Sequence, residues 1–145
     1  MGNTLKNVLA CVLGIVIGGA VNMGLIILGP TVIPPPVGVD VTDPESLAAG
    51  MHLFELRHYV FPFLAHALGT LAGAFVAYLV AGSQKLRMAL VIGVFFLAGG
   101  ITAATMIPAP IWFLALDLIV AYLPMAWLGA LLGSWAGSQK PSSAR

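Results

Sequence analysis

The chain has 145 residues, of which 60% are hydrophobic and only 8% charged, and its mean hydropathy is +1.04. Water-soluble domains carry about 25% charged residues, and a domain of this size has too little interior to hide so much apolar surface. This composition excludes a water-soluble domain and indicates a protein whose outer face meets lipid. The basic residues behind the net charge of +1 are few and scattered. That distribution excludes the basic patch of a nucleic-acid-binding protein.

Four apolar stretches are each long enough to cross a bilayer as a helix, which takes about 20 residues. They run over residues 5–29, 59–81, 86–107 and 111–136. The connections between the last three stretches are short, so neighbouring helices must run antiparallel. We therefore expect an all-α membrane protein, with a single membrane domain over residues 1–145 that forms an antiparallel bundle of four transmembrane helices.

The charged residues assign an orientation to these spans. Five of the six basic residues lie at the chain ends or beside the second connection: Lys6, Lys85, Arg87, Lys140 and Arg145. Four of the five acidic residues lie in the connector 30–58: Asp40, Asp43, Glu45 and Glu55. Because positively charged loops stay in the cytoplasm, we expect both termini there and the connector 30–58 on the outer side.

The connector 30–58 is expected to contain a short helix over residues 44–56. Thr42 is the predicted cap, Pro44 suits the first turn, and Glu45 follows the cap by three positions. The apolar residues of this segment fall at helical spacing: Leu47, Met51 and Phe54. Such a pattern is typical of a helix that lies at the membrane surface with its apolar side toward lipid.

Small residues recur at steps of four along the predicted spans. Helices in lipid associate where small residues let their backbones approach. We therefore predict helix contacts at Gly14, Gly18, Gly69, Gly73, Gly129, Gly133 and Gly137. Pro124 lies inside the fourth span, and because proline cannot continue the hydrogen bonding of a helix, it predicts a kink there.

A layer of polar residues is predicted about 10 Å below the outer surface, from the rise of about 1.5 Å per helical residue. The residues at this depth are Asn22, His66, Thr102, Thr105 and Asp117. The equal depth of His66 and Asp117 suggests that they pair. One interpretation is a proton-linked or ligand-binding site that opens outward. The other is a hydrogen-bonded lock that fixes the register of the helices.

A second candidate site lies on the predicted short helix, where His52, Glu55 and His58 follow one another at steps of three. Histidine and glutamate can bind zinc or copper. The alternative is a solvated face on which these residues pair with Arg57 or with lipid. A haem held between two histidines would need a partner for His66, and spans one, three and four contain none.

Three stretches resemble segments of small four-span bacterial inner-membrane proteins without an assigned function. They are VNMGLIILGP (21–30), MHLFELRHYVFPFLAHALGTLAGAF (51–75) and LDLIVAYLPMAWLGALLG (116–133). The resemblance implies a bacterial source and a location in the inner membrane. It implies no activity and no functional residue.

The function expected from the sequence is that of an accessory or structural membrane protein. Its expected partners are the lipid bilayer and either further copies of the chain or a larger membrane complex. One alternative is an oligomeric proton-linked channel or transporter of a small solute that uses His66 and Asp117, and a second is the binding of metal, haem or quinone at the outer face. The sequence contains no phosphate-binding loop, nucleophile elbow or HExxH motif, so we expect neither an enzyme nor a bound cofactor.

Overall fold

The computed structural model describes residues 1–138, and these form helices and the connections between them. In chain order the elements are α1 (Asn3–Val32), α2 (Pro44–Gly50), the 3-10 turns η1 (Met51–Leu53) and η2 (Leu56–Tyr59), α3 (Val60–Val80), α4 (Lys85–Met106), α5 (Ile111–Val120) and α6 (Leu123–Ser138). Four helical stretches are long and apolar enough to cross a membrane. The chain is a multi-pass membrane protein, and the predicted four-helix bundle is confirmed.

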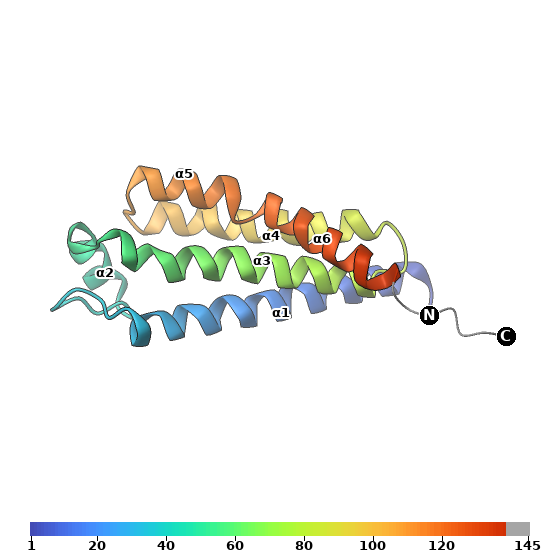
Figure 1. The fold of residues 1–145 in the computed structure, drawn as a ribbon, viewed down its shortest axis with the longest axis horizontal. Coiled ribbons are helices and arrows are strands. Elements are labelled where there is room, and N and C mark those ends of the chain that lie inside the picture. The colour runs from blue at the N-terminus through green and yellow to red at the C-terminus, as the bar shows by residue number, and fades with distance from the viewer. Residues whose placement is uncertain (139–145) are drawn as a thin grey trace.

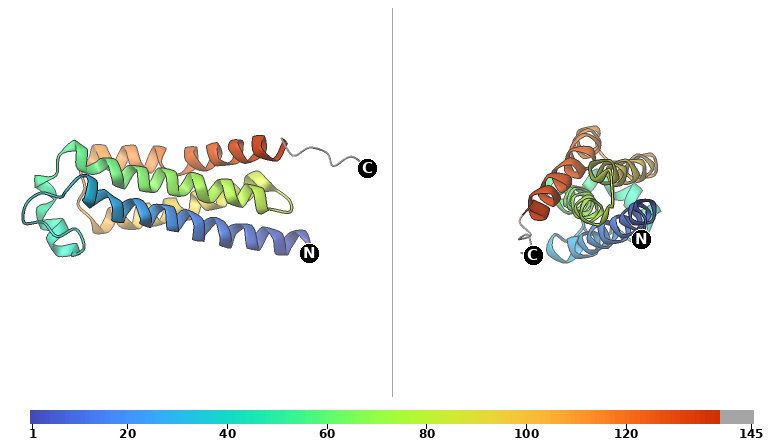
Figure 2. Two further views of the ribbon diagram at one scale, coloured as in Figure 1. Left: turned by 60° about the horizontal axis from the view of Figure 1, so that its bottom comes forward. Right: turned by 90° about the vertical axis from the view of Figure 1, so that its right-hand side faces the viewer.

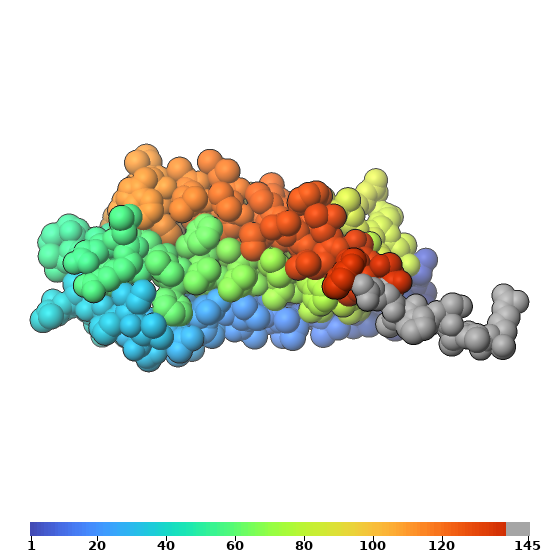
Figure 3. Space-filling model, viewed as in Figure 1, coloured from blue at the N-terminus to red at the C-terminus, as the bar shows by residue number. Residues whose placement is uncertain are grey.

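The long helices run antiparallel, so the bundle has two distinct ends (Figure 1). The terminal end holds the start of α1, the α3–α4 turn and the end of α6, whereas the connector end holds α2 and the α4–α5 turn. Helix α3 lies at the centre and packs against α1, α4 and α6 (Figure 2). In the space-filling view, α3 is visible as a band between α6 and α1 (Figure 3).

Glycines face one another where α1 crosses α3. A Cβ atom added to Gly14 would lie 2.8 Å from the carbonyl oxygen of Gly73, and one added to Gly18 would lie 2.7 Å from that of Gly69. A carbon atom cannot approach a backbone oxygen so closely without repulsion, since the best separation of such atoms is about 3.5 Å or more. Only glycine therefore permits this approach of two backbones, and the predicted contacts at these four positions are confirmed.

The glycines of α6 pack against α3 at two of the three predicted positions. A Cβ atom on Gly129 would lie 2.5 Å from the carbonyl oxygen of Leu71, and one on Gly133 would lie 2.8 Å from the ring of Tyr78. Gly137 makes no such contact within the described part of the chain, where nothing lies within 4 Å of a Cβ atom at this position. The next step along α6 passes the end of α3 at Val80, so Gly137 has no helix to meet.

The fourth span consists of two helices. The predicted kink at Pro124 is confirmed, and it takes the form of a break: α5 ends at Val120, Ala121 and Tyr122 form a turn, and α6 begins at Leu123. Pro124 has no N–H to donate to the carbonyl of Val120, and its ring would collide with that carbonyl in a continuous helix. The break determines where the side chain of Tyr122 lies.

The short helix in the connector differs from its prediction in length and cap. It begins at Pro44 as predicted, but Asp43 caps it by accepting hydrogen bonds from the N–H groups of Glu45 and Ser46. Thr42 instead donates to Asp40, and these hydrogen bonds hold the pKa of the Asp40 carboxyl below its ordinary value. The helix ends at Gly50 rather than at residue 56, because glycine is a weak helix former and favours helix ends.

Three apolar residues of the connector pack into the bundle, whereas Val37, Leu53 and Leu56 are exposed. Met51 forms a buried cluster with Tyr59 and Phe113, and Leu47 and Phe54 pack against it. Leu47, Met51 and Phe54 therefore contact other side chains of the chain at this end of the bundle. The connector lies over the connector end of the long helices (Figure 1), and its residues Pro35, Val41, Leu47, Met51 and Phe54 form part of the wall of an apolar cavity there.

Charges of opposite sign lie mostly at opposite ends of the bundle, with Arg57 as the basic residue at the connector end, where it pairs with Glu55. Lys6, Lys85 and Arg87 lie at the terminal end, and the acidic residues of the connector lie at the other. Lys140 and Arg145, which also entered the predicted orientation, lie outside the described residues. Apart from Asp117, the acidic side chains of the chain avoid the apolar middle of the helices.

Candidate functional site

His66 of α3 and Asp117 of α5 form a hydrogen-bonded pair inside the bundle. The Nδ1 atom of His66 lies 2.9 Å from both carboxyl oxygens of Asp117. Their side chains are 23% and 6% exposed, respectively. The Thr70 hydroxyl donates to the carbonyl oxygen of His66 one turn further along α3. Separating the two buried side chains would leave an unpaired polar or charged group inside the bundle, which costs free energy. We therefore expect the hydrogen bonds of the pair to hold both side chains in one geometry.

Tyr122 completes the site, and it is a residue that the sequence prediction missed. Its hydroxyl donates to Oδ2 of Asp117 at 3.0 Å, and its ring stacks on His66 with the ring centroids 5.7 Å apart. The Tyr122 side chain is buried against α4 at Gly100, where any Cβ atom would collide with it. Gly100 and the break after Val120 together allow Tyr122 to reach Asp117.

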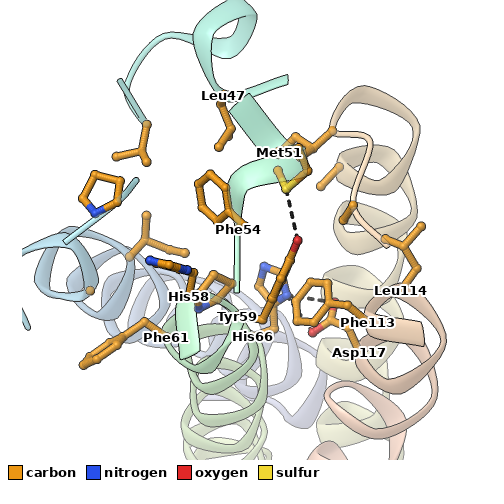
Figure 4. Close-up of a pocket in the computed structure, with 18 of the residues that line it drawn as sticks. Leu47, Met51, Phe54, His58, Tyr59, Phe61, His66, Phe113, Leu114 and Asp117 are labelled. Atoms are coloured by element: carbon orange, nitrogen blue, oxygen red, sulfur yellow. Dashed lines mark hydrogen bonds and ion pairs between the residues drawn. The ribbon is translucent and has the colours of Figure 1, made fainter. Parts of the chain in front are cut away.

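An ionised Asp117 places the ring proton of His66 on Nδ1. The carboxylate accepts from the Tyr122 hydroxyl, and an ionised carboxylate can only accept. Nδ1 of His66 is then a donor, so in the neutral ring Nε2 is left as an acceptor. Nε2 makes no hydrogen bond within residues 1–138, and it faces away from Asp117 (Figure 4).

A cavity of about 340 Å³ lies at the connector end, and His66 and Asp117 line it. Its wall comes from the connector-end halves of α1, α3, α4 and α5 and from the connector itself. Near the terminal end α4 fills the space beside α1 with Ile92 and Phe96, whereas toward the connector end α4 presents Gly100, Ala103 and Ala104. The small residues leave the space that forms the cavity.

Four side chains that can ionise line this cavity: His58, Tyr59, His66 and Asp117. Tyr59 donates its hydroxyl to the sulfur of Met51 at 3.4 Å, and its ring lies 4.8 Å from that of Phe113 (Figure 4). The remaining lining residues that the structure describes are apolar, and none is lysine or arginine. The cavity is therefore an apolar space with a polar pair at its inner end.

The other members of the predicted polar layer do not join this pair. Thr102 and Thr105 are exposed on α4, and their hydroxyls donate to the carbonyls of Ala98 and Thr102, so the prediction of burial is wrong for both. Asn22 packs against Gly69 on the side of α3 that faces α1. Within residues 1–138 it makes no hydrogen bond to the pair, because His66 lies on the side of α3 that faces α5.

The structure does not bring the predicted metal ligands together. His52 bonds to the carbonyl of Ala49, the backbone N–H of Glu55 donates to His58, and the Glu55 carboxylate pairs with Arg57 at 3.0 Å. Among the described residues, no three His, Cys, Asp or Glu side chains could hold a metal ion. The prediction of a metal site is wrong because it needed one helix over residues 44–56, and that helix ends at Gly50.

Comparison with protein-family models, with curated proteins and with solved structures finds no match for the chain. The fold of a four-helix bundle serves many unrelated functions, so it does not identify one. The function must be argued from the cavity and from the His66–Asp117 pair at its inner end.

Proposed function

We propose that this protein binds a lipid-soluble small molecule in the connector-end cavity, with His66 as the residue that bonds its polar group. The observation that carries the proposal is the position of the His66–Asp117 pair at the inner end of an otherwise apolar cavity. Ligand sites in proteins have volumes of about 300–1,000 Å³ and apolar walls with a few polar groups. A volume of about 340 Å³ lies within that range.

The cavity would belong to the outer leaflet of a bacterial inner membrane. This orientation rests on Lys6, Lys85 and Arg87 at the terminal end, because basic loops stay in the cytoplasm. The bacterial source rests on the resemblance of three sequence stretches. A ligand that dissolves in the bilayer could then enter beside α1 and α4, and it would not need to cross a charged surface.

An accessory role within a larger membrane assembly is a second proposal, and it is compatible with the first. It is supported by Gly19 and Gly24 of α1 and by Gly99 of α4, since nothing among the described residues lies within 4 Å of a Cβ at these positions. Small residues on an outer surface let another membrane helix approach. Proton-linked transport has less support, because Ala74, Ala77 and Ile92 pack with no exposure in the terminal half.

Filling the cavity is expected to abolish binding. An Ala104→Phe substitution places a ring in the cavity, whereas Ala98→Phe places the same ring on the exposed face of the same helix. Aminoanthracene, a fluorescent apolar probe, should bind the purified protein in mild detergent. Ala104→Phe should weaken its binding at least about tenfold, a loss of about 1.4 kcal/mol, and Ala98→Phe should leave the dissociation constant unchanged.

Equal binding of aminoanthracene by the two variants would contradict the proposal. The fluorescence would then come from probe dissolved in the detergent micelle and not from probe in the cavity. Both variants must elute as single species in size-exclusion chromatography for the comparison to hold. Mass spectrometry of extracts from the wild-type protein and from Ala104→Phe gives an independent measurement. A molecule bound in the cavity should be present in the first extract and depleted from the second.

A further inference from the structure

We infer that the molecule bound in the cavity carries a phenolic or hydroquinone hydroxyl, and that His66 takes the proton of that hydroxyl. This inference rests on the proposed function, since it names the class of molecule that the same cavity accepts. Three observations carry it: the acceptor atom that faces the cavity, the absence of cations from the cavity wall, and the buried carboxylate behind His66.

The first observation concerns the free nitrogen of His66. With Asp117 ionised, the contacts at Nδ1 place the ring proton there, and the neutral ring offers Nε2 as an acceptor. An acceptor at the inner end of an apolar cavity is satisfied by a ligand that donates an O–H group. A ketone or an ester has no proton to donate, so it would leave Nε2 without a partner.

The second observation concerns charge. No lysine or arginine lines the cavity within the described residues. A phosphate or carboxylate headgroup would therefore enter an apolar space without a cation, and burying an unpaired charge is costly. A phospholipid or a fatty acid fits this wall poorly, whereas a neutral aromatic alcohol enters without that cost. The rings of Tyr59 and Phe113 offer faces on which an aromatic ligand can pack.

The third observation concerns the fate of the proton. When the hydroxyl O–H bond breaks, the proton binds Nε2, and the oxygen keeps the electron pair as a phenolate. The imidazolium is then held between that phenolate and the carboxylate of Asp117, which remains bonded to Tyr122. Charge is conserved, and no oxidant or reductant takes part. The arrangement favours a phenol, because its proton is far more acidic than that of an aliphatic alcohol.

The other titratable groups that face the cavity already use the atoms that could accept or donate a proton in other hydrogen bonds. Nδ1 of His58 accepts from the backbone N–H of Glu55, and no carboxylate supports its ring. Tyr59 donates its hydroxyl to Met51. Among the lining residues from α1 and α4, none can ionise. His66 is the one lining histidine with a buried carboxylate partner in the described part of the chain.

Para-nitrophenol is the probe that tests this inference, because its neutral and ionised forms absorb at different wavelengths. Its binding is measured separately, by displacement of aminoanthracene. When bound to the wild-type protein it should ionise at a pH at least about one unit lower than when bound to His66→Gln. Asp117→Asn, which keeps an acceptor for Tyr122, should shift the ionisation in the same direction as His66→Gln.

His52→Gln is the matched control, since His52 is exposed and bonds only to its own backbone segment. It should leave both the displacement and the ionisation unchanged. If para-nitrophenol displaces aminoanthracene but ionises at the same pH in every variant, proton uptake by His66 is wrong and the binding cavity stands. If it fails to displace aminoanthracene, the ligand class is wrong. If aminoanthracene itself does not bind, the proposed function fails.

Discussion

A Gly18→Val variant is expected to lose about 3 kcal/mol of its free energy of unfolding, at the upper end of the cost of overpacking. The new side chain would meet the carbonyl oxygen of Gly69 at 2.7 Å and the ring of Phe96 at 2.8 Å. A backbone oxygen cannot rotate away as a side chain can, so α1 must separate from α3. Unfolding with increasing fractions of an ionic detergent in mixed micelles measures this loss.

Gly19 provides the control for this prediction, since it is the next residue of the same helix. Nothing among the described residues lies within 4 Å of a Cβ atom on Gly19. Gly19→Val should therefore change the free energy of unfolding by less than about 0.5 kcal/mol, as surface substitutions do. Similar losses in both variants would show that valine disturbs α1 itself, and the account of close backbone packing would be wrong.

An Asp117→Leu variant is expected to lose about 2 kcal/mol of stability and to bind the para-nitrophenol probe more weakly than the wild type. The substitution leaves His66 and the Tyr122 hydroxyl without their acceptor. Removing one partner of a buried ion pair costs roughly 3–5 kcal/mol in water-soluble proteins. Interhelical hydrogen bonds in membranes cost less, about 0.6 kcal/mol on average and up to about 1.7. The loss of two hydrogen bonds in lipid therefore gives a destabilisation of about 2 kcal/mol, below the range for water-soluble proteins.

The double variant His66→Leu with Asp117→Leu separates a structural role from a functional one. Two leucines bury no unpaired charge, so the double variant should recover part of the stability that Asp117→Leu loses. It should still bind the probe more weakly than the wild type, because leucine offers no acceptor in place of Nε2. If the pair is only a lock for helix register, the double variant should bind the probe as the wild type does, and that result would overturn the proposed role of His66.

The spans and the kink could be predicted from the sequence because each depends on local physical chemistry. Length and hydropathy define a helix that crosses a bilayer, and Pro124 breaks a helix wherever it stands in the interior. Counting residues from the end of a span also gives depth, which is why His66 and Asp117 were expected at one level. Span length, the helix break and depth can all be predicted without knowing which face each helix turns toward its neighbours.

The errors arose where rotation about the helix axis mattered. Successive residues of a helix turn by about 100°. Thr102 and Thr105 therefore lie roughly 200° and 140° around α4 from Gly100, which faces Tyr122. The depth of Thr102 and Thr105 along the helix predicted that they belong to the layer, but their angular position around α4 puts them on its outer face. The spacing of Gly93 and Gly100, seven residues apart and both packed against the fourth span, was the signal that could have identified the inner face.

Tyr122 and the cavity could not be found by the same reasoning. In an unbroken helix Tyr122 would lie about 140° from Asp117, too far around the axis to bond with it. Only the break before Pro124 brings them together. The cavity depends on the connector, where Leu47, Met51 and Phe54 turn inward onto Tyr59 and Phe113. The inward turn follows from the early end of α2 at Gly50, a detail that helical spacing alone does not reveal.

Nitrogen NMR of protein with isotope-labelled histidine, in detergent micelles, tests the central claim most directly. The signals of His66 are those that disappear in His66→Gln. The account predicts a proton on Nδ1 in a strong hydrogen bond that Asp117→Asn weakens, and an Nε2 signal that moves when para-nitrophenol is added. A proton on Nε2 of the neutral ring, unchanged by Asp117→Asn and by the probe, would contradict both the pair and its role in the cavity.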